Sequence, residues 1–136
     1  MIWVDTSAFI ALTLETDPYH RLAANFANTL GPETRLLTSN FILAETMTYL
    51  NRRHGPEKAY TFGDRILRSS IYEIAEIDTS IFHDAMKLLQ KFSDKDLSFT
   101  DLTSFALMRL HKIKKAFTFD GDFMKAGFQM VPNENK

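Results

Sequence analysis

Near its start the chain reads Ile2-Trp3-Val4-Asp5-Thr6-Ser7, and this segment predicts how the fold begins. The first three residues form a short apolar run, which is typical of a buried strand. Asp5 ends that run, and Thr6-Ser7 then offers capping oxygens before the apolar-rich residues 8–14. We therefore predict a buried strand that leads into a helix, with an aspartate at the junction.

The same pattern returns near the end of the chain. Lys115-Ala116-Phe117-Thr118-Phe119 reads as a second central strand, and it ends at Asp120 as the first ends at Asp5. Further strand-like runs lie at 36–38, 72–77 and 129–131, and the last of these is expected at a sheet edge. Helical spacing or capping residues predict helices over 19–30, 39–53, 58–69, 78–92 and 101–111. This alternation predicts an α/β fold, a three-layer α/β/α sandwich with a mainly parallel central sheet.

Composition narrows the classes of function. The 136 residues are 45% hydrophobic and 24% charged, so we expect a single globular domain over residues 1–136. The absence of cysteine excludes disulfides, thiolate nucleophiles and cysteine-ligated metals. The apolar stretch 2–14 is interrupted by Asp5 and followed by Glu15, so we expect no membrane span or signal peptide and a cytoplasmic protein. A formal charge of -1 means that any nucleic-acid site must be a local basic surface.

Acidic residues occupy the positions where such a sheet places its sites. Asp5 and Asp120 each follow a predicted strand, so their carboxylates are expected at the same edge of a parallel sheet. Asp101 falls in the first turn of its predicted helix, which also lies near that edge. Neighbouring carboxylates repel one another unless a cation neutralises them, and Mg²⁺ or Mn²⁺ prefers oxygen ligands. A cation held there would suit phosphodiester hydrolysis.

Each of these residues also has an ordinary structural interpretation. Asp5 and Asp101 are typical of helix starts, and Asp120 and Asp122 are typical of a turn around Gly121. Glu45 lies in the second turn of its helix, away from the centre of the apolar stripe. The helical spacing therefore predicts neither that Glu45 is buried nor that its side chain points towards a site.

Taken together in order, five segments of the chain resemble the PIN domain family, and within it the VapC-type toxin ribonucleases of bacterial and archaeal toxin–antitoxin pairs. The segments are residues 4–12 (VDTSAFIAL), 43–45 (LAE), 97–101 (LSFTD), 117–123 (FTFDGDF) and 127–128 (GF). Each is weak alone, but the set is specific in this order.

The resemblance implies a site and a substrate. It implies that the acidic quartet of Asp5, Glu45, Asp101 and Asp120 is catalytic and binds the metal, with Asp122 as an accessory carboxylate and further metal ligand. It implies that Ser7 or Thr118 is a nearby hydroxyl able to hold a water bound to the metal, Mg²⁺ or Mn²⁺. RNA would be hydrolysed to a 5′-phosphate and a 3′-hydroxyl, and the partners would be a cognate antitoxin and a second copy of the chain.

Other interpretations stay open at this point. The chain is alternatively a catalytically silent PIN-like module that binds RNA or protein, or a small aspartate-based phosphatase. Against a phosphatase, Thr6-Ser7 follows Asp5 in place of a second aspartate two residues on. Two basic clusters, 52–54 and 109–115, are candidates for RNA contact or simply solvated helix ends. Apolar residues in 47–50 and 62–67 exceed what one small core needs and suggest a dimer or antitoxin surface.

Overall fold

The computed structural model describes residues 1–92 and 96–133 and contains a five-stranded, fully parallel sheet. The strand order is β3-β2-β1-β4-β5, so the first strand of the chain lies at the centre. The strands are β1 (Ile2–Val4), β2 (Leu36–Ser39), β3 (Tyr72–Ala75), β4 (Lys115–Phe117) and β5 (Gln129–Val131). Since all strands run in one direction, their carboxyl ends meet at one edge of the sheet.

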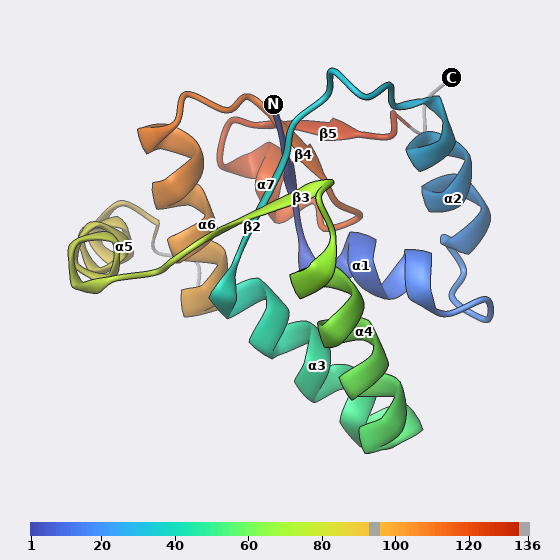
Figure 1. The fold of residues 1–136 in the computed structure, drawn as a ribbon. Helices are drawn as coiled ribbons and strands as arrows, with labels where there is room; N and C mark the ends of the chain where they lie inside the picture. Colours follow the sequence, from blue (N-terminus) through green and yellow to red (C-terminus); the bar gives the residue numbers. More distant parts are fainter. Residues whose placement is uncertain (93–95, 134–136) are drawn as a thin grey trace.

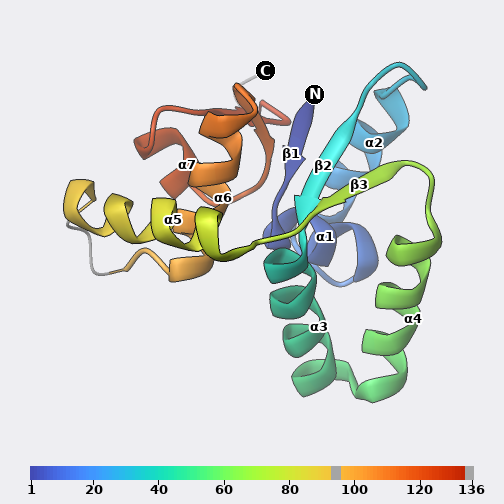
Figure 2. The same ribbon diagram turned by 60° about the vertical axis from the view of Figure 1, so that its left-hand side comes forward.

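Helices cover both faces of this sheet, which confirms the predicted three-layer α/β/α sandwich. They are α1 (Thr6–Thr13), α2 (His20–Thr29), α3 (Asn40–His54), α4 (Pro56–Arg68), α5 (Thr79–Lys91), α6 (Phe99–Leu110) and α7 (Asp122–Lys125). Helices α5, α6 and α7 lie on one side, α1, α2 and α4 lie on the other, and α3 leads away from the carboxyl edge (Figures 1 and 2).

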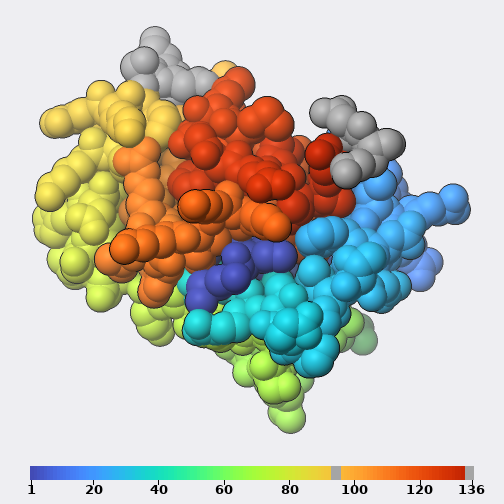
Figure 3. All heavy atoms as spheres, turned by 90° about the horizontal axis from the view of Figure 1, so that it is seen from above, coloured from blue at the N-terminus to red at the C-terminus, as the bar shows by residue number. Residues whose placement is uncertain are grey.

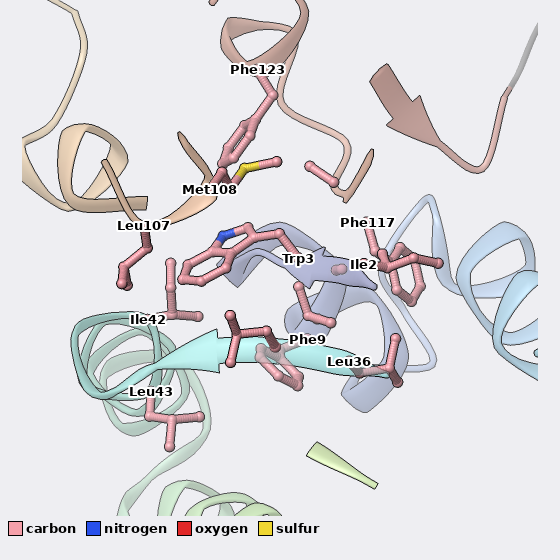
Figure 4. Close-up of a cluster of buried hydrophobic side chains, with 14 of the residues drawn as sticks. Ile2, Trp3, Phe9, Leu36, Ile42, Leu43, Leu107, Met108, Phe117 and Phe123 are labelled. Carbon is pink, nitrogen blue, oxygen red and sulfur yellow. The ribbon is translucent and has the colours of Figure 1, made fainter. Parts of the chain in front are cut away.

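The core is built around β1. Trp3 and Val4 are fully buried, as a central parallel strand covered on both faces requires. Trp3 pairs with Leu37 on one side and Ala116 on the other. Figure 4 shows its indole directed towards the α6 side of the sheet, where Met108 lies. The apolar run that predicted a buried strand is thus the middle of the molecule.

Three bounds differ by two residues from the sequence-based prediction: β3 ends at Ala75 and not at residue 77, α4 begins at Pro56 and not at residue 58, and α6 begins at Phe99 and not at residue 101. Two further differences concern β4 and α7. Strand β4 ends at Phe117 and not at Phe119, because the Thr118 hydroxyl accepts a hydrogen bond from the backbone N–H of Asp120 and turns the chain. The short helix α7 follows where only a turn was predicted, since four residues carry no readable helical period. Both differences fall next to the predicted acidic residues.

Helices α3 and α4 form a hairpin whose apolar residues are mostly internal. Leu50, Phe62 and Ile66 are between 0 and 5% exposed. The prediction that the apolar residues in 47–50 and 62–67 form a dimer or antitoxin surface was therefore wrong for these three. Leu67, by contrast, is 68% exposed. The hairpin turns at Gly55, whose φ of 92° and ψ of 168° suit glycine alone.

The opposite, amino edge of the sheet carries a different kind of surface. Figure 3 looks onto this edge, where the start of the chain lies between the segments that precede β2 and β4. A hollow there is lined by three lysines and one glutamate with three uncharged residues: Lys112, Lys114, Lys115, Glu33, Met1, Ile2 and Thr34. The basic cluster 109–115 therefore faces away from the edge that carries the acidic residues. None of the described helices is long and apolar enough to cross a membrane.

Candidate active site

Asp5 lies between β1 and α1 at the carboxyl edge of the sheet and is 3% exposed. It stands at the N-cap position of α1, yet its side chain makes no capping hydrogen bond. The carboxylate turns instead to the residues that follow β4. Burial raises the pKa of Asp5 to about 6, with a further contribution from nearby Asp120, although hydrogen bonds from Thr118, Thr6 and Ser7 oppose the shift.

Two hydroxyl groups hold the Asp5 carboxylate in place. The Thr118 hydroxyl donates to Oδ2 of Asp5 at 2.9 Å, and the Ser7 hydroxyl lies 3.1 Å from the same oxygen and 3.0 Å from Thr118 Oγ1. Ser7 Oγ also accepts from the backbone N–H of Phe119 at 2.9 Å. Both hydroxyls predicted beside the site are therefore there, and they orient Asp5 by tying the β1–α1 junction to the loop after β4.

Glu45 reaches the same region from the second turn of α3. Its Oε1 accepts a hydrogen bond from the Thr6 hydroxyl at 2.5 Å, across the contact between α1 and α3. The sequence suggested only a capping role for Thr6, and the hydrophobic period of α3 did not indicate where the Glu45 side chain points. No local pattern would have found this pair, because it joins residues 39 apart.

Asp101 occupies the third position of α6 and has two roles. Its Oδ2 accepts from the Ser98 backbone N–H at 3.2 Å while the Ser98 hydroxyl accepts from the Asp101 N–H at 3.0 Å, which completes a capping box. The residue is 9% exposed. Burial raises its pKa to about 7, as do the negative charges of Asp5, Asp120 and Glu45. Asp101 therefore starts its helix, as its structural interpretation requires, and also lies beside the other acidic residues.

Asp120 and Asp122 complete the cluster from the loop after β4. Oδ1 of Asp120 accepts from the Asp122 backbone N–H at 2.9 Å, an Asx turn that leads into α7. Carboxylate oxygens of Asp101, Asp120 and Asp122 lie within 4.8 Å of one another. Among the described residues, the Lys125 ammonium forms a salt bridge with this trio, 3.7 Å from Asp122. The structure therefore brings all five predicted carboxylates to the carboxyl edge of the sheet.

The chemistry of this donor set fits a hard divalent cation. The donors of the trio are carboxylate oxygens from two segments of the chain, and two further carboxylates stand beside them. Burial is the main cause of the raised pKa values of Asp5 and Asp101, and repulsion by neighbouring carboxylates adds to it. Positive charge supplied from outside would relieve that repulsion.

The fold and this pocket define a small α/β domain with a carboxylate site at the carboxyl edge of a parallel sheet. The chain belongs to the PIN domain family, whose model matches residues 2–129. The resemblance seen in the sequence is thereby confirmed.

One relative is similar to this chain over nearly its full length, in both sequence and structure. The 23S rRNA-specific endonuclease VapC20 of Mycobacterium tuberculosis is 37% identical over 134 residues, which cover 98% of this chain and 100% of the relative. The crystal structure of M. tuberculosis VapC20, a toxin that cleaves the sarcin–ricin loop, superimposes with a TM-score of 0.87 at 36% identity, covering 94% of this chain and 96% of that one.

A more distant solved structure shares the fold alone. The VapBC2 complex of Rickettsia felis, bound to a DNA fragment from its promoter, has a TM-score of 0.71 at 16% identity and covers 96% of this chain and 97% of that one. The sheet and its helices are thus retained at an identity where side chains have largely changed.

Proposed function

We propose that the chain is a divalent-metal-dependent endoribonuclease, one nuclease domain over residues 1–136, and the toxin of a toxin–antitoxin pair. The observation that carries this is the trio Asp101, Asp120 and Asp122, within 4.8 Å of one another beside buried Asp5. Near-full-length identity of 37% to a 23S rRNA-specific endonuclease supports ribosomal RNA as the substrate.

The residues divide into holding and orienting roles. Asp101, Asp120 and Asp122 would hold Mg²⁺ or Mn²⁺, with Asp5 and Glu45 as the neighbouring members of the acidic set. Thr118, Ser7 and Thr6 act through the carboxylates that they contact, and so are positioning residues. When bound, the cation stabilises charge on the phosphodiester oxygens and lowers the pKa of a water. Water would attack phosphorus, and the 3′ oxygen of the preceding nucleotide would leave and take up a proton.

Protein partners form part of the same proposal. Phe82, Met86 and Leu89 are 42, 46 and 54% exposed, and their spacing of four and three residues puts them on one face of α5. An exposed apolar stripe of this kind supports contact with another protein. A cognate antitoxin and a second copy of the chain are the partners that we propose.

The test is cleavage of bacterial ribosomal RNA by the purified chain with Mg²⁺, with Mn²⁺ and with chelator. Discrete products carrying a 5′-phosphate, formed only with metal and absent for Asp120→Asn, are expected. Cation binding measured by calorimetry, but no cleavage of any RNA, would instead support the silent binding module. Incorporation of phosphate from an aryl phosphate into the protein would favour the phosphatase.

A further inference from the structure

A groove runs along α3 from the acidic pocket towards the tip of the hairpin. Its volume is about 570 Å³, and it is lined by residues Phe41, Ala44, Glu45, Thr48, Tyr49, Arg52, Arg53 and Thr100. Glu45 belongs to the acidic set, and Thr100 directly precedes Asp101, so one end of the groove opens at the candidate active site. Figure 2 shows α3 leading away from the carboxyl edge of the sheet, with α4 alongside it.

The far end of the groove is positively charged. Arg52 and Arg53 are exposed, and neither forms a salt bridge within the described part of the chain. The Arg53 guanidinium lies over the Tyr49 ring, 4.7 Å from its centroid, and this contact holds the ring and the cation together as one surface. A flat aromatic group and free guanidinium donors are the groups that bind bases and phosphates of RNA.

Spacing along α3 matches the size of a nucleotide strand. Arg52 lies seven residues after Glu45 within one helix, which corresponds to about 10 Å along the helix axis. Since a stacked strand rises about 3.4 Å per nucleotide, Arg52 would meet a phosphate about three nucleotides from the one being cleaved. The three positions 45, 49 and 52 also share a face of α3.

We infer that this groove binds the RNA strand that flanks the scissile phosphate, with Arg52 on a backbone phosphate and the Tyr49–Arg53 pair against a base. This inference rests on the proposed ribonuclease function and adds to it the surface that binds the substrate. Because a carboxylate pocket repels a polyanion, attraction must come from a basic surface beside it. The lysines at the amino edge are not beside the pocket, since they lie at the opposite edge of the sheet.

The experiment compares two charge-matched double variants. Arg52→Ala/Arg53→Ala removes two positive charges from the groove, and Lys114→Ala/Lys115→Ala removes two from the amino edge, where both lysines are exposed. Binding of a fluorescent RNA hairpin carrying the sarcin–ricin loop is measured by anisotropy from low to high salt. An Asp5→Asn background prevents cleavage during this measurement. Thermal unfolding of each variant checks that it is folded.

The arginine variant is expected to bind the hairpin at least about 10-fold more weakly, with the slope of log Kd against log salt smaller by about 1. The lysine variant should match the parent. Tyr49→Leu should weaken binding about 5- to 100-fold without changing the slope. In the active background, the arginine variant should raise KM and leave kcat within about 3-fold, because the scissile phosphate still meets the intact carboxylates.

Equal affinity and equal slope for the two double variants would overturn the inference. So would an arginine variant that binds RNA normally but changes the association state of the chain in sedimentation, since the groove would then be a protein contact. Failure of the proposed function would be seen separately, as an unmodified chain that cleaves no RNA. The two outcomes are distinguishable because hairpin binding is measured without cleavage.

Discussion

Thr118 donates a hydrogen bond to Oδ2 of Asp5 at 2.9 Å, although 113 residues separate them in the chain. The same hydroxyl oxygen accepts the backbone N–H of Asp120 at 3.0 Å. One buried threonine therefore fixes the Asp5 carboxylate and the start of the loop that carries Asp120 and Asp122.

Replacing Thr118 by valine keeps the shape of the side chain and removes both hydrogen bonds. We expect metal affinity and cleavage to fall about 10- to 100-fold, the usual effect of losing a group that orients a ligand. Calorimetric metal titration and initial rates measure this. Thr46→Val is the matched control, because Thr46 is equally buried but, among the described residues, its side chain bonds only the Ile42 carbonyl within α3. A Thr118 variant that binds metal as tightly as the control would show that the contact is merely structural.

Replacing Asp101 by asparagine separates its two roles. The amide oxygen can still accept the Ser98 N–H, so the free energy of unfolding should not fall by more than about 1 kcal/mol. Loss of the charge should lower cleavage at least about 100-fold and weaken metal binding. Asp78→Asn makes the same change at the N-cap of α5, where Asp78 accepts from Ile81 N–H, and should retain activity. Full activity of the Asp101 variant would remove it from the site.

Stability of the metal-free chain should fall as pH rises. The folded-state pKa of Asp5 is raised from 3.8 to about 6 and that of Asp101 to about 7, so folding favours their neutral forms. The stability that the two neutral carboxyl groups contribute is fully present below pH 3.8 and is lost as the pH rises through 6 and 7. In urea unfolding with chelator present, the free energy of unfolding should be lower at pH 8 than at pH 5 by on the order of 3 kcal/mol.

Two controls accompany the pH measurement. Added Mg²⁺ should restore stability at pH 8, since a bound cation compensates the ionised carboxylates. In the Asp101→Asn protein the pH dependence should be smaller. Metal-free stability that instead rises between pH 5 and pH 8 would contradict the electrostatic account of the pocket.

The hairpin between α3 and α4 depends on one backbone conformation. Gly55→Ala should destabilise the protein by about 1–3 kcal/mol, because an L-residue is strained at φ 92° and ψ 168° while no atom of the described residues within 4 Å obstructs a Cβ. Gly121→Ala is the control for chemical denaturation, since Gly121 also has open space but a φ of -63° that alanine adopts freely. Equal effects of the two substitutions would exclude backbone strain as the cause.

The sequence predicted what depends on local pattern. Parallel strands alternating with helices followed from apolar runs and capping residues, and the positions of Asp5, Asp101 and Asp120 followed from the strand and helix ends. The direction of Glu45 did not follow, because its partner Thr6 lies on a different helix. The end of β4 was misplaced by two residues, since the Thr118 turn depends on a hydrogen bond and not on hydrophobicity.

The order of the acidic residues along the chain has a consequence for synthesis. Asp5 is synthesised before the other four acidic residues, but β1 pairs with β4, and the Asp5 carboxylate is held by Thr118. Asp120 and Asp122 are made later still. A growing chain therefore lacks the complete set of five carboxylates until residue 122 has been translated. We therefore expect fragments from stalled translation that end before Asp120 to have no ribonuclease activity.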